Sequence, residues 1–141
     1  MKLTVPRAIY DEMINECLQG MPNEACGFLG GGKDDVVTKI YPLTNEAASP
    51  VFYRPASREM IAAFSDMDQH SIDLVAIFHS HVATEPYPSA TDRREAHYPD
   101  TVYLIVGFVD PGAPQTRGFL IHKKDWRDED GEIEEVDVVI S

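Results

Sequence analysis

Residues 74–92 read LVAIFHSHVATEPYPSATD, and the fold and the chemistry of the chain can be argued outward from this stretch. The apolar run at its start predicts a buried strand. Because side chains alternate along a strand, His79 and His81 are expected to emerge on the same face at its end. Asp92 offers a carboxylate from the far side of a short loop. Two neutral imidazoles and one carboxylate fill three positions of a catalytic zinc site and leave the fourth open for water.

The spacing resembles the signature of the JAMM (MPN+) metalloproteases. That signature is His-x-His, seven residues, Ser, two residues and Asp, which matches His79, His81, Ser89 and Asp92. The family also has an upstream glutamate on another strand, and Glu24 in the segment NEACGFLG is the matching residue. The resemblance is closest to the small stand-alone prokaryotic members, which act on ubiquitin-like sulfur-carrier proteins.

The resemblance, which runs from about residue 6 to residue 109, implies a fold and an activity. The fold is an α/β MPN domain over residues 1–141, with a mixed sheet or partial barrel flanked by helices. The activity is zinc-dependent hydrolysis of the bond after a diglycine-type tail, which releases cysteine or a lysine-linked conjugate. In this comparison Glu24 is the general base and Ser89 donates a hydrogen bond to the oxyanion.

Ser89 and Asp92 also have a purely structural interpretation. The pattern Ser-x-x-Asp after Pro88 is typical of a helix N-terminus, where the two side chains cap the first turn. Taken alone, this pattern favours a cap. The two roles are compatible, because a cap can fix the geometry that a metal ligand needs.

Composition narrows the class of protein. A chain of 141 residues with 43% hydrophobic and 26% charged residues predicts one soluble globular domain. The net charge of −12 argues against nucleic acid as a partner. No apolar run is long enough for a membrane span, and the N-terminal residues lack the core of a signal peptide, so we expect a cytoplasmic protein with no membrane partner. The sequence does not decide whether the protein forms a homodimer.

Two further features have simple interpretations. Eight acidic residues lie between Asp125 and Asp137 against one basic residue, Arg127, and they are read first as a solvated tail and edge strand. The alternative is a docking patch for a basic partner. Cys17 and Cys26 are interpreted as packing thiols of a reduced compartment.

The periodicity predicts a mixture of helices and strands along the chain. The expected helices cover residues 6–20, 57–70 and 89–97. The expected strands cover residues 24–29, 36–41, 51–54, 73–81, 101–109, 116–122 and 136–140.

Two other functions remain as alternatives. A non-catalytic MPN scaffold that binds carrier or partner proteins would keep the fold without turnover. A zinc deaminase would use a similar metal site, but the chain lacks the Pro-Cys-x-x-Cys ligand pair of that class. The remaining histidines, His70, His97 and His122, have no comparable partners in the sequence and are expected to be structural or surface residues.

Overall fold

The computed structural model describes residues 1–141, and its seven strands form one mixed sheet in the order β1-β7-β6-β5-β4-β2-β3. Neighbouring strands are antiparallel except for two parallel pairs, β1 with β7 and β4 with β5. The strands are β1 (Lys2–Val5), β2 (Cys26–Gly31), β3 (Val37–Leu43), β4 (Asp73–His81), β5 (Val102–Gly107), β6 (Gln115–His122) and β7 (Glu132–Ile140).

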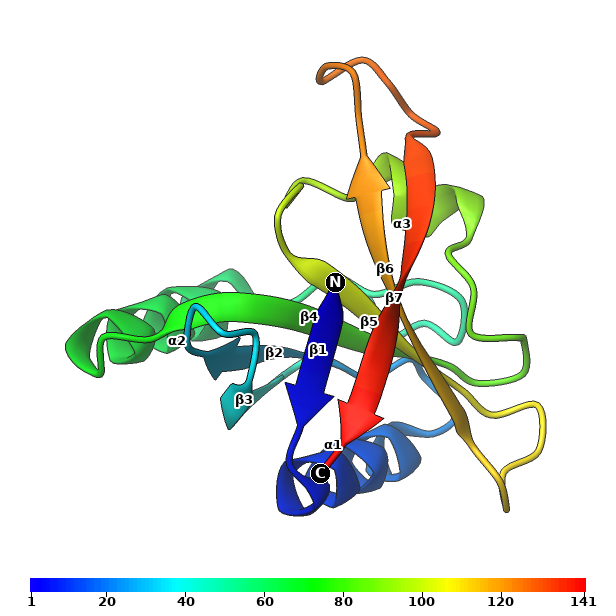
Figure 1. The fold of residues 1–141 in the computed structure, drawn as a ribbon. Helices are drawn as coiled ribbons and strands as arrows, with labels where there is room; N and C mark the ends of the chain where they lie inside the picture. Colours follow the sequence, from blue (N-terminus) through cyan, green and yellow to red (C-terminus); the bar gives the residue numbers. More distant parts are fainter.

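The sheet is strongly curved, so that its two edge strands approach each other (Figure 1). An isolated bridge pairs Thr4 of β1 with Val36, just before β3. The Thr4 amide also donates a hydrogen bond to the carbonyl of Asp35, with a nitrogen-to-oxygen distance of 3.0 Å. The sheet is therefore nearly closed into a barrel, as expected for the predicted fold.

Three helices accompany the sheet, namely α1 (Arg7–Gly20), α2 (Ser57–Gln69) and α3 (Ala90–Arg94). The first lies across one end of the sheet, and the second lies beside β4 and β3 (Figure 1). These two helices match their predicted ranges to within a residue, whereas α3 is shorter than predicted because the chain leaves the helix and buries Ala96. No helix combines the length and the apolar character that crossing a membrane requires.

β4 is the central strand that carries the histidines to their place. It pairs with β2 on one side and β5 on the other, and residues 75–81 are all buried. Its side chains alternate between the two faces of the sheet, so Phe78 packs in one apolar cluster and Ile77 in the other. His79 and His81 continue the face of Ile77 beyond the apolar part of the strand.

The predicted strand at residues 51–54 is wrong. Val51, Phe52 and Tyr53 are residue types that favour strands, but this segment pairs with no strand of the sheet. Its backbone instead bonds to a side chain, because Asn45 donates to the Phe52 carbonyl and accepts from the Arg54 amide. The only bridge of this region pairs Asn45 with Pro55.

The C-terminal segment also differs from the prediction. β7 begins at Glu132 rather than Val136, and it is not an edge strand, since it lies between β6 and β1. The edge is β1, which the sequence pattern did not indicate. A four-residue strand has too little periodicity to be recognised, and β1 is defined by its parallel pairing with the far end of the chain.

Candidate metal centre and active site

Three side chains converge at the end of β4. The Nε2 atom of His79 lies 3.2 Å from the Nε2 atom of His81. The Oδ2 atom of Asp92 lies 3.2 Å from the first nitrogen and 3.0 Å from the second. A tetrahedral zinc ion with bonds of about 2.0–2.1 Å holds its ligand atoms roughly 3.3 Å apart. The three predicted ligands are therefore placed together, and their donor atoms fit one metal ion.

The orientation of His81 is fixed by the loop that follows β4. Its Nδ1 atom lies 2.8 Å from the carbonyl oxygen of Glu85, so the N–H is donated there and the Nε2 lone pair is left for a metal. This loop crosses β5 closely at Gly107, where an added Cβ would lie 2.7 Å from the Pro86 ring. A glycine at this position is thus needed to bring Glu85 to the histidine.

Asp92 and Ser89 form a capping box at the start of α3. The Ser89 hydroxyl accepts from the Asp92 amide at 3.0 Å, and Asp92 Oδ2 accepts from the Ser89 amide at 2.9 Å. Burial would raise the pKa of the Asp92 carboxyl, but the charge of His79 and the hydrogen bonds from both histidines and from Ser89 hold it well below its usual range. Because the Ser89 hydroxyl acts here only as an acceptor, its proton is free to be donated to a ligand.

Glu24 lies at the same end of the sheet as the histidines. Cys26 pairs with His79, and the Ser80 amide donates to the Ala25 carbonyl, so Glu24 is level with His81 on the neighbouring strand. Its side chain is buried, and its Oε1 atom has no hydrogen-bond partner in the protein. Burial, followed by the nearby Asp92 carboxylate, raises the pKa of Glu24 to about 8.

Ser80 has a structural role beside the candidate ligands. Its hydroxyl accepts a hydrogen bond from the Ala25 amide at 2.8 Å, which fastens the start of β2 to β4. The residue that follows Glu24 is therefore held on both its N–H and its C=O by Ser80.

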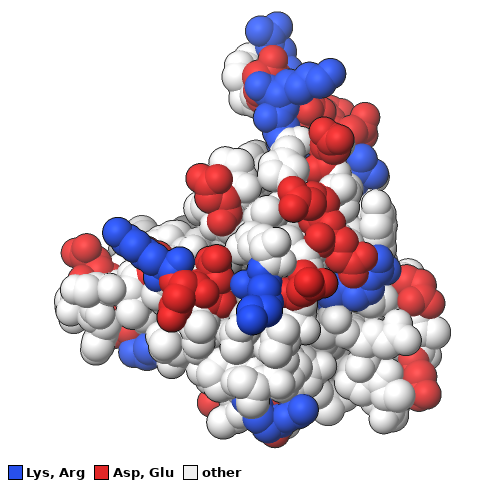
Figure 2. Space-filling model, in the orientation of Figure 1, with Lys and Arg blue, Asp and Glu red and all other residues white.

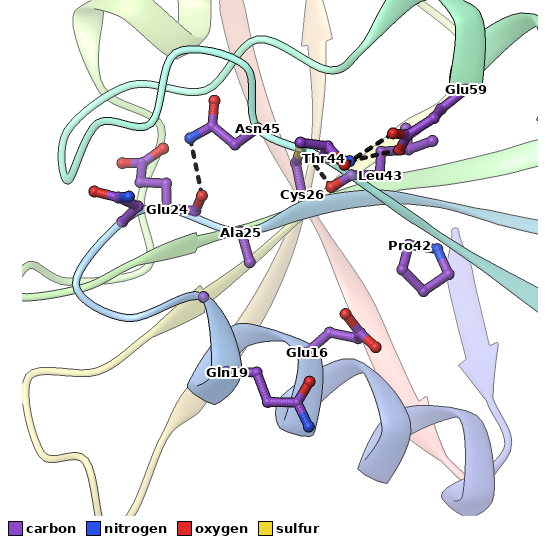
Figure 3. A pocket seen from close by; sticks show the side chains of 12 residues that line it. Glu16, Gln19, Glu24, Ala25, Cys26, Pro42, Leu43, Thr44, Asn45 and Glu59 are labelled. Atoms are coloured by element: carbon purple, nitrogen blue, oxygen red, sulfur yellow. Dashed lines mark hydrogen bonds between the residues drawn. The ribbon is translucent and has the colours of Figure 1, made fainter.

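Two residues near the site were missed in the sequence. Asn45 donates a hydrogen bond to the Glu24 carbonyl at 2.9 Å, and Figure 3 shows its amide pointing at that oxygen beside a polar cavity. Tyr53 lies against His79, with ring centroids 4.5 Å apart. Neither residue belongs to a recognisable motif, and their contacts arise only when distant segments of the chain meet.

The acidic segment is joined to the active-site helix. Arg93 Nε donates to the Asp130 carbonyl at 2.7 Å, and the same guanidinium reaches the Gly131 carbonyl at 3.3 Å. In addition, the Lys123 ammonium group donates a hydrogen bond to the Arg94 carbonyl at 2.8 Å. Figure 2 shows acidic side chains running along the hairpin of β6 and β7 with basic ones near its tip. The segment is thus part of the sheet and a support for α3, rather than a tail.

The other histidines and the cysteines stay outside the metal centre. His70 and His122 are exposed, and His97 is an exposed residue beside an apolar cavity. Cys17 and Cys26 are buried free thiols, and burial raises the pKa of each to about 12. Thiols of this kind are packing groups, as predicted.

An open groove leads away from the metal centre along the loop after β4. Its volume is about 590 Å³, it is open to solvent, and it reaches the candidate ligand His81. Its lining residues are His81, Ala83, Thr84, Glu85, Tyr87, Ser89 and Val109.

Comparison with known proteins places the chain in a family. The family model of prokaryotic homologs of the JAB domain matches residues 6–122. The CysO-cysteine peptidase of Mycobacterium tuberculosis is 36% identical over 120 residues, which covers 84% of this chain and 82% of the relative. The desampylase of Haloferax volcanii is 34% identical over 110 residues, covering 74% and 79% of the two chains. The chain belongs to the family of prokaryotic JAB domain homologs, so the predicted family is confirmed.

Solved structures agree with this assignment. A protein from Desulfitobacterium hafniense superposes with a TM-score of 0.86 at 38% identity, covering 100% of this chain and 93% of the other. A JAB1/MPN domain protein from Archaeoglobus fulgidus shares the fold, with a TM-score of 0.52 at 16% identity and coverage of 97% and 96%. The predicted MPN fold is therefore confirmed, and the names of the relatives agree with the predicted class of enzyme, a peptidase.

Proposed function

We propose that this protein is a zinc-dependent peptidase or isopeptidase, with residues 1–141 acting as one catalytic domain. It would hydrolyse the bond that follows the C-terminal diglycine-type tail of a ubiquitin-like sulfur-carrier protein and release cysteine or a lysine-linked conjugate. The observation that carries the proposal is the convergence of His79, His81 and Asp92, with ligand atoms within 3.2 Å, beside a buried glutamate.

His79, His81 and Asp92 are proposed to hold the zinc ion. A zinc ion bound there supplies Lewis acidity and makes water a stronger acid. Buried imidazoles with one fixed tautomer suit zinc, and the His81 tautomer is set by the Glu85 carbonyl. These three side chains would provide three donors, so a bound ion would still be able to take up water or substrate.

The protein's own groups would move the proton and stabilise the charge. Glu24 would accept the proton of the attacking water and return it to the leaving amine, and its unpartnered Oε1 atom leaves an acceptor for this task. Ser89 would donate its hydroxyl proton to the oxygen of the scissile carbonyl as negative charge develops there.

The substrate class is supported by the groove and by the relatives. A groove along the loop after β4 fits an extended tail, and glycine residues allow the backbone of such a tail to come close to the ligands. One relative is named a CysO-cysteine peptidase, another a desampylase, and a third, from Thermus thermophilus, a probable TtuB-protein conjugate cleaving protease. With a net charge of −12, nucleic acid is not proposed as a partner. A cytoplasmic location and a homodimer stay predictions.

Incubation with defined conjugates tests the proposal. A carrier–cysteine and a carrier–lysine conjugate would be mixed with zinc-loaded protein, and the products read by mass spectrometry. Release of free carrier by the wild type, with none from Glu24→Gln, is the expected result. Zinc-loaded protein that binds the carrier but cleaves neither conjugate would favour the non-catalytic scaffold instead.

A further inference from the structure

The two histidines of the metal centre are oriented in different ways. His81 donates its Nδ1 hydrogen to the Glu85 carbonyl, the usual arrangement for a metal-ligating histidine. The Nδ1 atom of His79 is buried, and no hydrogen-bonding group of the protein lies within reach. On its Nδ1 side the His79 ring is therefore held by packing rather than by a hydrogen bond, whereas its Nε2 atom faces Asp92 and His81.

The packing partner of His79 is an aromatic ring. The ring of Tyr53 stacks on the imidazole with a centroid separation of 4.5 Å and an angle of 23° between the planes. Stacked rings at this distance attract each other beyond the area they bury. Because one face of the His79 ring is covered by Tyr53, tilting the imidazole plane away from its present orientation would break the stack.

One side chain binds the backbone on both sides of Tyr53. Asn45 donates to the carbonyl of Phe52 at 3.0 Å and accepts from the amide of Arg54 at 2.9 Å. The two residues that flank Tyr53 are thus bound to the same amide group. Asn45 also donates to the Glu24 carbonyl, so the segment of Tyr53 is joined to the segment of the proposed base. Figure 3 shows Asn45 in this position above the cavity.

We infer that Tyr53 is a positioning residue for the metal ligand His79, with ring stacking in place of the usual hydrogen bond, and that Asn45 holds Tyr53 there. The inference rests on the metal site of the proposed function. The aromatic ring of Tyr53 orients His79 by stacking, and the Tyr53 hydroxyl group is not required.

Zinc affinity tests the inference without relying on activity. Wild type, Tyr53→Leu and Tyr53→Phe would be titrated with zinc against a chromophoric chelator, and the cobalt-substituted proteins would be compared by their visible spectra. Loss of a group that orients a metal ligand lowers affinity by about tenfold. We expect a loss of this size and an altered cobalt spectrum for Tyr53→Leu, and restoration of both by Tyr53→Phe.

Two more variants complete the test. Asn45→Asp keeps the acceptor for Arg54 but loses the donors to Phe52 and Glu24, so it should weaken zinc binding in the same direction as Tyr53→Leu. Tyr98→Leu is the matched control. Tyr98 and Tyr53 line the same apolar cavity, but Tyr98 is partly exposed and does not stack on His79 or His81. It should bind zinc like the wild type.

Two results would contradict the proposed role of Tyr53. If Tyr53→Leu only melts at a lower temperature, with zinc affinity and cobalt spectrum unchanged, Tyr53 is merely structural. If Tyr53→Phe loses as much affinity as Tyr53→Leu, the hydroxyl is responsible and the stacking explanation fails. Either result leaves the proposed function intact, whereas a wild type that binds no metal would overturn both.

Discussion

Ser89 and Asp92 are bound to each other twice, since each side chain accepts a hydrogen bond from the backbone amide of the other. The bond to Asp92 Oδ2 comes from the Ser89 main chain, so it does not depend on the serine side chain. Structural and chemical roles of Ser89 can therefore be separated by mutation.

Ser89→Ala is expected to reduce turnover much more than stability. Removing an N-cap hydroxyl costs about 1 kcal/mol of unfolding free energy. Removing an oxyanion donor lowers turnover roughly a hundredfold or more. Zinc content should stay near that of the wild type, because the amide bond to Asp92 remains. Steady-state kinetics and thermal unfolding measure the two effects, and a variant that is less stable but equally active would limit Ser89 to capping.

Glu24→Gln should keep the fold and bind zinc but lose turnover. An amide is nearly isosteric with the carboxyl group, yet it cannot accept the proton of water at neutral pH. The variant should still bind a carrier conjugate, which a pull-down with the uncleaved conjugate would detect. Cleavage near the wild-type rate by a zinc-loaded Glu24→Gln protein would show that another group is the base.

Metal analysis should find about one zinc ion per chain, as expected for a single site of three protein ligands. His79→Ala and Asp92→Ala are expected to lose the ion, because two donors cannot hold it tightly. Cys17→Ser and Cys26→Ser are the controls and should retain it, since both thiols are free and neither belongs to the group of three candidate ligands. Full zinc occupancy in the His79 and Asp92 variants would contradict the ligand assignment.

The stability of the metal-free protein should fall as the pH rises from 5 to 8. The pKa of Glu24 is raised to about 8 by burial and by Asp92, so folding favours its protonated form. This contribution is complete below the unfolded-state pKa near 4.5 and is lost as the pH rises through the folded value. Unfolding temperatures in a chelator at several pH values measure the trend, and Glu24→Gln should flatten it.

Zinc should reverse that trend. The histidines must be neutral to bind the ion, so protons compete with zinc and its stabilising effect grows as the pH rises. For His81, burial lowers the pKa, but the Asp92 carboxylate and the Glu85 carbonyl outweigh it and leave the pKa raised. The same unfolding measurements with saturating zinc would contradict this prediction if stability did not increase from pH 6 to pH 8.

Arg93→Ala should loosen the helix that carries Asp92. This helix has five residues and buries none of them, so it depends on its cap and on its bonds to the hairpin loop. Losing the guanidinium should cost about 1 kcal/mol and weaken zinc binding. Arg94→Ala is the matched control, because its one side-chain bond, to Thr91, is long at 3.4 Å. Equal zinc affinities for the two variants would show that the hydrogen bonds of Arg93 to the hairpin loop do not affect zinc binding.

The sequence alone was sufficient wherever the relevant physics is local. Alternation along one strand puts His79 and His81 on one face, and a three-residue spacing makes Ser89 and Asp92 a capping box. Both features depend on neighbours within a few residues, so the candidate ligands could be named before the fold was known. The helices α1 and α2 were predictable for the same reason.

Only the tertiary structure decided which distant segments complete the site. Tyr53 lies on the segment 51–54 that was predicted to be a strand, and Asn45 precedes that segment. Their contacts with His79 and Glu24 exist because β2, β4 and the loop at 45–55 meet in space. The acidic segment likewise became a support for α3 through Arg93. Such contacts join residues tens of positions apart, and no local pattern records them, since only the folded chain brings those residues within bonding distance.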